Sequence, residues 1–431
     1  MKLTLAMVFS LLVWGPAGAA PRVLYVRCGM LIYDTQKAPI KGAGIVITDG
    51  TVTAMGANLP MPAGSEQLDL SRYTVVPGFA DAHIHLWTGP RGENPSAPLA
   101  VLRASRAMAY ALDSGVAAVR VLGSSDFIDV ALKNAIDDGT IPGPHVVPAA
   151  HPISIPAGHN DQFTLPSSMP LEDYYTPLHG FVNSPQDAEK AVHLQIKYGA
   201  RVIKILASGG VMSPLDSPTA EQLSPEEMQV IVAQAHMAGV KVSAHDENLQ
   251  TILDALHAGV DSLEHGSDLN QEAIDYMKAH HVSETPCIYI VDDLVANGEK
   301  QRVPDYVLQK VKELSRGHFA SFKLALANGV TINAGSDQSY EPGKGTVLDE
   351  MITEVKFGMT PQQALTTATR NSAAMLGLDN LGTLDVGKEG TLVALDGDPL
   401  TNIQAVKQTR VVVFQGKVAL DKTTGTADRT R

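Results

Sequence analysis

The stretch Val75-Val76-Pro77-Gly78-Phe79-Ala80-Asp81-Ala82-His83-Ile84-His85 decides the fold class of this chain, because an apolar β-forming run leads directly into two histidines. Side chains alternate across a strand, so His83 and His85 project from the same face. Two neutral imidazoles aimed at one point are a common beginning of a metal site. The chain contains 14 histidines, so one such pair is weak evidence by itself, and its meaning depends on the other ligands that the chain supplies.

Outward from this stretch, the middle of the chain alternates strand-like and helix-like segments. Helices are predicted over 187–198, 225–238 and 307–328, and Ser224 and Pro225 are a typical helix start. The strand-like segments are 74–80, 117–122, 145–150, 201–206, 240–244, 261–264, 282–288 and 330–335. Eight strands alternating with helices over about 300 residues predict an α/β fold, a (β/α)8 TIM barrel over residues 76–384. The long segment 152–184 is predicted to be a lid or a pocket wall.

The two ends of the chain share a sequence pattern that differs from that of the middle. Residues 21–75 and 385–431 contain short runs of alternating apolar and polar residues, separated by turn signals such as Asp49-Gly50 and Gln415-Gly416. We therefore expect one small β-sandwich domain that is built from both chain ends and accompanies the barrel.

Residues 1–20 have the layout of a secretory signal peptide. One lysine precedes an apolar run from Leu3 to Trp14, and the small residues Ala17-Gly18-Ala19-Ala20 follow. A membrane anchor is the alternative, but the run is too short to span a bilayer comfortably. The sequence thus predicts a periplasmic or secreted protein that has no membrane association once the signal is cleaved.

Composition describes an ordinary globular protein. The chain is 44% hydrophobic and 18% charged, and its formal charge of −13 argues against nucleic-acid binding. Cys28 and Cys287 are its two cysteines, which leaves either one disulfide or two free buried thiols. A homo-oligomer is compatible with this composition.

The chemistry-bearing residues fall at the expected strand ends. In a barrel of this type, active-site groups lie at the carboxyl ends of the strands. His83 and His85, His245, His265 and Asp337 occupy such ends, and Lys204 lies inside the apolar run Val202–Leu206. A buried ammonium is costly, so a Schiff base, a phosphate or carbamylation by CO2 must neutralise Lys204. Carbamylation is favoured, because four histidines and a carboxylate point at the same barrel mouth.

At these residues the chain resembles the amidohydrolase superfamily. The motifs are "VPGFADAHIHL", "GARVIKILASGGVMSP", "VKVSAHDENLQ", "GVDSLEHGSDL" and "INAGSDQS". The runs "VMSPLDSPTAEQLSPEEM" and "AGHND" are most similar to the exported metal-dependent carboxypeptidases, which include Xaa-Pro and Xaa-Arg dipeptidase-like enzymes and ochratoxin-type amidases. Imidazolonepropionases lack the bridging lysine, so Lys204 argues against their chemistry.

The resemblance implies a centre of two divalent metal ions. His83, His85 and Asp337 would bind the first ion and His245 and His265 the second. Lys204, as its carbamate, would bridge both together with a hydroxide. Such ligands suit Zn2+, with Mn2+ or Co2+ as alternatives.

Two further residues are expected to act on the substrate. Asp337 would take the proton of the attacking hydroxide and pass it to the leaving amine. By resemblance, His159 would hold the substrate carbonyl or carboxylate, although a solvated loop histidine is the alternative. His151 is a candidate of lower rank. The remaining histidines are expected to be structural or exposed: His145, His179, His193, His236, His257, His280, His281 and His318.

The sequence therefore predicts a metal-dependent hydrolase of C–N bonds. Its substrate would be a small-molecule or short-peptide amide, cleaved next to a C-terminal amino acid by a dipeptidase, carboxypeptidase or N-acyl-amino-acid amidase, with ochratoxin-type amides included. The same ligands would equally serve the hydrolysis of esters, lactones or cyclic amides. A non-catalytic binding protein is disfavoured, because it would have lost ligands that this chain retains.

Overall fold

The Pro77-Gly78 step divides the decisive stretch into two strands that belong to different sheets. Strand β5 (Glu66–Pro77) ends before Gly78, and β6 (Phe79–Ile84) begins after it. A Cβ at Gly78 would lie 2.6 Å from Cβ of Ala117 and 2.9 Å from Cγ2 of Thr391, so only glycine fits where the sheets meet. The predicted first barrel strand, 74–80, is therefore wrong in its bounds: the barrel strand begins at Phe79.

The structure is a computed structural model that describes residues 21–86, 96–161, 174–341 and 343–423. The predicted signal peptide lies outside these residues, as does much of the predicted lid. Among the described helices, none is long and apolar enough to cross a membrane.

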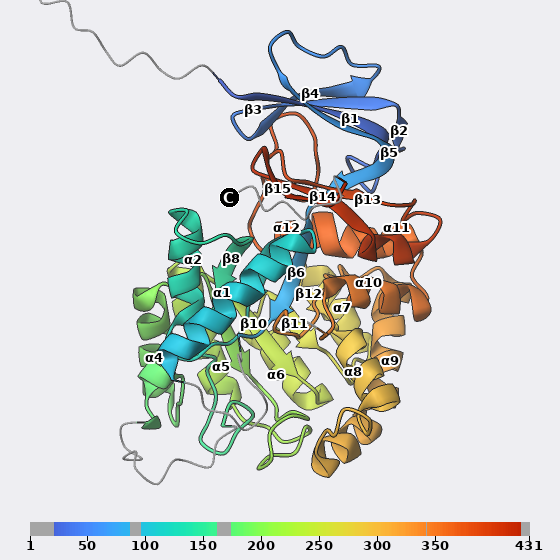
Figure 1. The fold of residues 1–431 in the computed structure, drawn as a ribbon. Coiled ribbons are helices and arrows are strands. Elements are labelled where there is room, and N and C mark those ends of the chain that lie inside the picture. The colour runs from blue at the N-terminus through green and yellow to red at the C-terminus, as the bar shows by residue number, and fades with distance from the viewer. Residues whose placement is uncertain (1–20, 87–95, 162–173, 342, 424–431) are drawn as a thin grey trace, which may run out of the picture.

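Parallel strands lie inside the larger part of the molecule, with helices around them (Figure 1). Direct pairing joins β6 through β8 and, separately, β9 through β12. The barrel strands are β6 (Phe79–Ile84), β7 (Val116–Val121), β8 (His145–Pro148), β9 (Val202–Leu206), β10 (Lys241–Asp246), β11 (Ser262–His265) and β12 (Ser283–Thr285).

Backbone hydrogen bonds close the two gaps between these groups of strands and complete a ring. The Ile153 amide donates to the Lys204 carbonyl at 2.8 Å, which joins the chain after β8 to β9. Residues 331–337 form the eighth member, because the Asn333 amide donates to the Glu284 carbonyl and the Ala82 amide to the Ala334 carbonyl, both at 2.8 Å. The predicted (β/α)8 barrel is thus confirmed.

Helices surround this ring on the outside (Figure 1). The Ser224 side chain and Glu227 form a capping box at the start of α5, as the sequence predicts for this N-cap. The helices are α1 (Ala97–Asp113), α2 (Ile128–Asp137), α4 (Pro185–Tyr198), α5 (Pro225–Met237), α6 (Leu249–Ala258), α7 (Gln271–His280), α8 (Ile288–Asn297), α9 (Asp305–Asn328), α10 (Val347–Lys356), α11 (Pro361–Thr366) and α12 (Ser372–Met375), with short turns η1 (Pro177–His179), η2 (Thr367–Asn371) and η3 (Ile403–Lys407).

The second sheet combines strands from both chain ends, which Figure 1 shows as blue and red ribbons side by side. β5 pairs with β1 from the N-terminal part and with β13 from the C-terminal part. The sheet folds over one apolar cluster to which both parts contribute. Its other strands are β1 (Val23–Leu31), β2 (Ile40–Lys41), β3 (Ala43–Thr48), β4 (Thr51–Ala57), β13 (Leu392–Leu395), β14 (Thr409–Phe414) and β15 (Lys417–Asp421).

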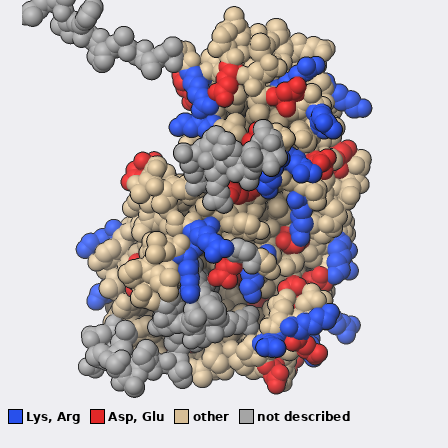
Figure 2. All heavy atoms as spheres, in the orientation of Figure 1, with Lys and Arg blue, Asp and Glu red and all other residues tan. Residues whose placement is uncertain are grey.

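The position of this sheet fixes which end of the barrel is open. Because β6 follows β5 after a single glycine, the sheet covers the amino end of β6, and the histidines lie at the opposite end. On the face in Figure 2, Lys and Arg are interspersed with Asp and Glu, so the net charge of −13 is not gathered there in one acidic patch.

The fold predicts that Phe79, buried without exposure at the start of β6, supports the barrel core. Phe79→Ala should lower the free energy of unfolding by about 3–5 kcal/mol, since it removes a large side chain and leaves a cavity. Urea unfolding followed by circular dichroism measures this change. Leu102→Ala is the control, because Leu102 is 69% exposed on α1 and should change stability by less than about 0.5 kcal/mol. Equal effects of the two substitutions would contradict the prediction.

Candidate metal centre

Three of the predicted ligands meet at the carboxyl end of β6. The Nε2 atoms of His83 and His85 lie 3.2 Å apart. Asp337 Oδ1 lies 3.5 Å from His83 Nε2 and 3.3 Å from His85 Nε2. The Asp337 amide donates to the His83 carbonyl at 2.8 Å, and Asp337 has a left-handed φ of 51°. Non-glycine residues held in this conformation are frequent at functional sites.

The histidines of β10 and β11 extend this group. The metal-binding atoms of His83, His265 and Asp337 lie within 4.8 Å of one another. The ring centroid of His245 is 4.7 Å from that of His265. Lys204 pairs with Ser243 in the sheet, two residues before His245, and is 1% exposed. The structure therefore brings the histidines and Asp337 to one barrel end, with Lys204 buried on the strand beside His245.

Burial sets the protonation of these groups. It lowers the pKa of His83 to about 4 and the pKa values of His245 and His265 well below the usual range. Burial also lowers the pKa of Lys204 to about 8, against the opposing charges of Glu264 and Asp337. Imidazoles that are neutral at pH 7 can bind metal, and an amine with a pKa near 8 is partly neutral and nucleophilic.

For Asp337, the neighbouring charges and not burial decide the pKa. Burial alone would raise its pKa, but the neighbouring His83, His85 and Lys204 outweigh burial and hold the pKa below its usual value. Asp337 is therefore an ionised carboxylate at neutral pH. Neutral imidazole nitrogens and one carboxylate form a donor set that fits a divalent cation such as Zn2+.

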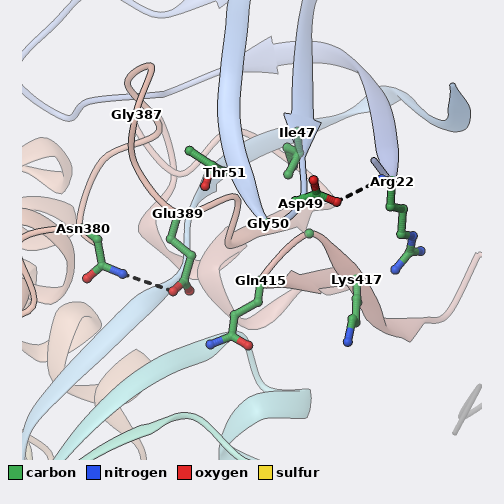
Figure 3. A pocket seen from close by; sticks show the side chains of 11 residues that line it. Arg22, Ile47, Asp49, Gly50, Thr51, Asn380, Gly387, Glu389, Gln415 and Lys417 are labelled. Atoms are coloured by element: carbon green, nitrogen blue, oxygen red, sulfur yellow. Dashed lines mark hydrogen bonds between the residues drawn. The ribbon is translucent and has the colours of Figure 1, made fainter. Parts of the chain in front are cut away.

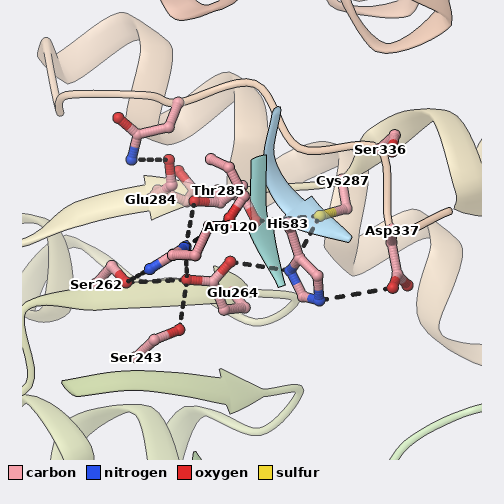
Figure 4. A network of polar contacts seen from close by, with 12 residues as sticks. His83, Arg120, Ser243, Ser262, Glu264, Glu284, Thr285, Cys287, Ser336 and Asp337 are labelled. Carbon is pink, nitrogen blue, oxygen red and sulfur yellow. Dashed lines mark hydrogen bonds and ion pairs between the residues drawn. The ribbon is translucent and has the colours of Figure 1, made fainter. Parts of the chain in front are cut away.

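A buried ion pair orients His83 (Figure 4). Glu264 Oε2 lies 2.9 Å from His83 Nδ1, and the Arg120 guanidinium donates to Glu264 Oε1 at 2.6 Å. Ser243 and Ser262 also donate to Oε1, at 2.7 and 2.9 Å. Burial disfavours ionisation of Glu264, but Arg120 and His83 keep its pKa well below the usual value. An ionised Glu264 accepts a hydrogen bond from the Nδ1–H group of His83. The proton therefore stays on Nδ1, and the lone pair of Nε2 faces Asp337.

Sequence reasoning missed Arg120 and Glu264. Glu264 directly precedes His265, so the motif Glu264-His265 could have indicated it. Arg120 interrupts the apolar strand β7, as Lys204 does on β9, but this signal does not identify its partner. Only the closed barrel brings their side chains together.

Both cysteines are free and buried, so the second of the two predicted alternatives holds. Cys287 Sγ lies 3.5 Å from His83 Nδ1. Burial raises the pKa of both thiols, so both are protonated at neutral pH.

His159 lies beside the second pair of ligands. Its ring stacks on that of His245 with centroids 4.4 Å apart, and its Nδ1 lies 2.9 Å from Ser213 Oγ. A Cβ at Gly210 would lie 2.2 Å from Cε1 of His159, so the close approach of this loop requires glycine. The ring is therefore held at the centre, while His151 accepts a hydrogen bond from the Asp126 amide at 3.2 Å, outside the group of ligand atoms.

A pocket opens next to His245, His265 and Asp337 and reveals residues that the sequence did not indicate. Glu247, Ser267 and His318 line it together with His159 and several apolar side chains. Ser267 Oγ donates to Glu247 Oε2 and lies 2.8 Å from His318 Nδ1. His318, expected to be structural or exposed, is buried (1% exposed) and lines this pocket from the inner face of α9.

A wider cavity, of about 500 Å3, lies in the sheet built from the chain ends (Figure 3). Arg22, Asp49, Glu389 and Lys417 are its charged lining residues. None of the predicted ligands is among the residues that line it, so it is separate from the metal centre.

Comparison with known proteins agrees with this geometry. The sequence model of the amidohydrolase family matches residues 74–419. Ochratoxinase of Aspergillus niger is 31% identical over 421 residues, which cover 92% of this chain and 86% of that protein. A crystal structure of a Xaa-Pro dipeptidase with bound methionine in the active site superposes with a TM-score of 0.84 at 28% identity, over 92% of this chain and 99% of that chain. A prolidase complexed with N-methylphosphonate-L-proline superposes with a TM-score of 0.82 at 26% identity, over the same shares.

The Glu264–His83 bond predicts a loss of metal affinity in Glu264→Gln. A glutamine carries no charge and holds the Nδ1 proton less strongly, so the affinity for Zn2+ should fall about 10- to 100-fold. Competition with a chelator measures this affinity directly, without any substrate.

Glu284→Gln is the matched control, because Glu284 is equally buried, on the neighbouring strand β12. Burial raises the pKa of Glu284 well above its usual value, which favours its neutral form, so its substitution should leave the affinity unchanged. If the two variants held Zn2+ equally well, the role assigned to Glu264 would be wrong.

Proposed function

Since this chain belongs to the amidohydrolase family, we propose that it is a binuclear metal-dependent hydrolase that cleaves an amide or peptide bond to a C-terminal amino acid. As a family member it is a hydrolase of amide or peptide C–N bonds. The observation that carries the finer proposal is the meeting of His83, His265 and Asp337 around one point at the barrel mouth. A buried Lys204 behind them supports a second cation.

The metal ligands follow from this arrangement. His83, His85 and Asp337 would hold one cation, and His245 and His265 the other. Lys204, carbamylated by CO2, would hold both with its two oxygens, which also removes the cost of a buried ammonium. When bound, two divalent cations supply a nucleophilic water at neutral pH and polarise the scissile carbonyl.

Asp337 is the proposed proton carrier. Its side chain is 20% exposed at the mouth of the barrel, where a substrate can reach it. Because its pKa lies below the usual value, it is ionised before the reaction and can accept the proton of the attacking water. Once protonated, it is a strong acid that readily gives the proton to the departing amine.

His159 is proposed to contact the substrate carbonyl or carboxylate. The ring is held from behind by Ser213 and lies flat against His245. This support fixes its position relative to the proposed ligands, as is required of a group that binds the reacting carbonyl.

Three relatives support an amide next to an amino acid as the substrate. One is an ochratoxinase, one a Xaa-Pro dipeptidase with bound methionine, and one a prolidase complexed with N-methylphosphonate-L-proline. The amidohydrolase family model matches residues 74–419, a span that includes every proposed ligand.

Lys204 is expected to be required for metal binding and for activity. Lys204→Ala should lose bound metal and reduce kcat/KM for N-acyl amino acids and dipeptides by at least about 100-fold, because it removes the bridging group. Metal analysis and assays with added Zn2+ and bicarbonate measure both effects. Lys197→Ala, at an exposed position of α4, is the control. Full activity of Lys204→Ala, or active wild-type protein without metal, would refute the proposed centre.

His159 is expected to be required for activity but not for metal binding. His159→Ala should lower kcat/KM by about 10²- to 10³-fold, since a group at the reacting carbonyl is lost, while the content of Zn2+ stays that of the wild type. His193→Ala, an exposed histidine of α4, should change neither quantity. A wild-type rate for His159→Ala would make His159 a supporting residue only. Faster turnover of lactones or hydantoins than of amides by the wild type would shift the assignment to those substrates.

A further inference from the structure

The pocket beside the proposed metal ligands has a continuous apolar wall. Val211 and Met212 come from the loop after β9, Ile290 and Val291 from α8, and Leu314 from α9. All five are neither fully buried nor fully exposed. Partly exposed apolar side chains that gather in one concave site beside reactive groups are typical of a surface that a ligand covers.

A packed apolar layer supports this wall. Leu294 of α8 and Val311 of α9 also line the pocket and are 3% and 1% exposed. They belong to one apolar cluster that Val211 and Met212 extend. The wall is therefore the exposed edge of an apolar core between α8 and α9.

Neither lysine nor arginine is found among the described residues that line this pocket. Lys310 lies on the same helix as Val311 and Leu314, but its Nζ donates to the carbonyls of Gly210 and Ser213, at 3.1 and 2.7 Å, and contacts Asp216 at 3.2 Å. These contacts hold the loop that carries Met212, so the Lys310 ammonium already has its partners within the protein. An acidic substrate side chain would thus find no counter-charge on this wall.

Among the described residues that line the pocket, Glu247 and Asp337 are the carboxylates. Its Oε2 accepts a hydrogen bond from Ser267 Oγ, which also contacts His318 Nδ1. Together with His159, His245, His265 and Asp337, these three side chains are the polar part of the lining. The carboxylate is engaged within the protein, and the larger share of the lining is apolar.

We propose that this pocket selects amides that carry an uncharged apolar side chain, aromatic or branched aliphatic, on one side of the scissile bond. The proposal rests on the proposed amide hydrolysis and adds its substrate class. Covering the exposed parts of Val291, Met212 and Leu314 removes apolar surface from water, which favours such a substrate. A cationic or anionic side chain would instead lose its hydration there without gaining a partner on the wall.

The test uses the full-length, zinc-loaded protein. N-acetyl amino acids and dipeptides are compared that carry phenylalanine, leucine, arginine or glutamate on either side of the bond. We expect kcat/KM for the best phenylalanine or leucine substrate to exceed that of every arginine or glutamate substrate by at least about tenfold. Val291→Asp should lower kcat/KM for the phenylalanine substrate about 10- to 100-fold, and Leu314→Glu should act in the same direction.

Val295→Asp is the matched control. Val295 lies one turn further along α8, is 49% exposed and does not line the pocket, so the same substitution there should leave kcat/KM unchanged. Metal content and melting temperature show that each variant is folded and loaded. Arginine or glutamate substrates that are cleaved as well as phenylalanine substrates would overturn the inference, as would equal effects of Val291→Asp and Val295→Asp.

A binding measurement distinguishes this inference from the proposed function. Calorimetric titration of the loaded protein with N-acetylphenylalanine and N-acetylarginine requires no turnover. If the wild type cleaves none of the amides but binds N-acetylphenylalanine more tightly, and Val291→Asp abolishes this preference, the proposed reaction fails and the apolar pocket stands. If amides are cleaved and no apolar preference appears in either assay, the pocket assignment alone fails.

Discussion

The buried ion pair between Arg120 and Glu264 is the interaction on which the proposed centre depends. A carboxylate taken out of water is costly unless charges and hydrogen bonds compensate it, and Glu264 obtains both from Arg120 and two serines. Its second oxygen is then available to His83 Nδ1. The ion pair in the barrel interior thus fixes the orientation of the His83 ring at the barrel mouth.

The same region shows how one barrel end separates polar chemistry from apolar recognition. The proposed ligands come from strand ends, whose positions the ring of backbone hydrogen bonds fixes. The apolar wall comes from α8 and α9, outside the ring. Strands therefore hold the groups that must be placed accurately, and helices and loops provide the surface that can vary with the substrate. Lys310 connects the two parts, because it links α9 to the loop after β9.

Most of the barrel could be predicted from sequence, because most of its strands contain a short apolar run between helical patterns. The first strand was misplaced, since an unbroken β-forming run hides the change of sheet at Gly78. The positions of the histidines and Asp337 follow from strand ends, and Lys204 from its place inside an apolar run, whereas their roles as ligands come from the family resemblance. His318 could not be recognised in this way, because a histidine within a helix looks the same whether it faces solvent or a pocket.

The sequence by itself determined the order of strands and helices, the positions of the histidines at strand ends, and the burial of Lys204 within an apolar run. These are local properties, set by side-chain alternation and hydrophobic pattern. Only the tertiary structure decided that Arg120 meets Glu264 across the barrel and that α8 and α9 form an apolar wall beside His245 and Asp337. Contacts between residues far apart in the chain depend on how the ring of strands closes, and a local sequence pattern does not predict that closure.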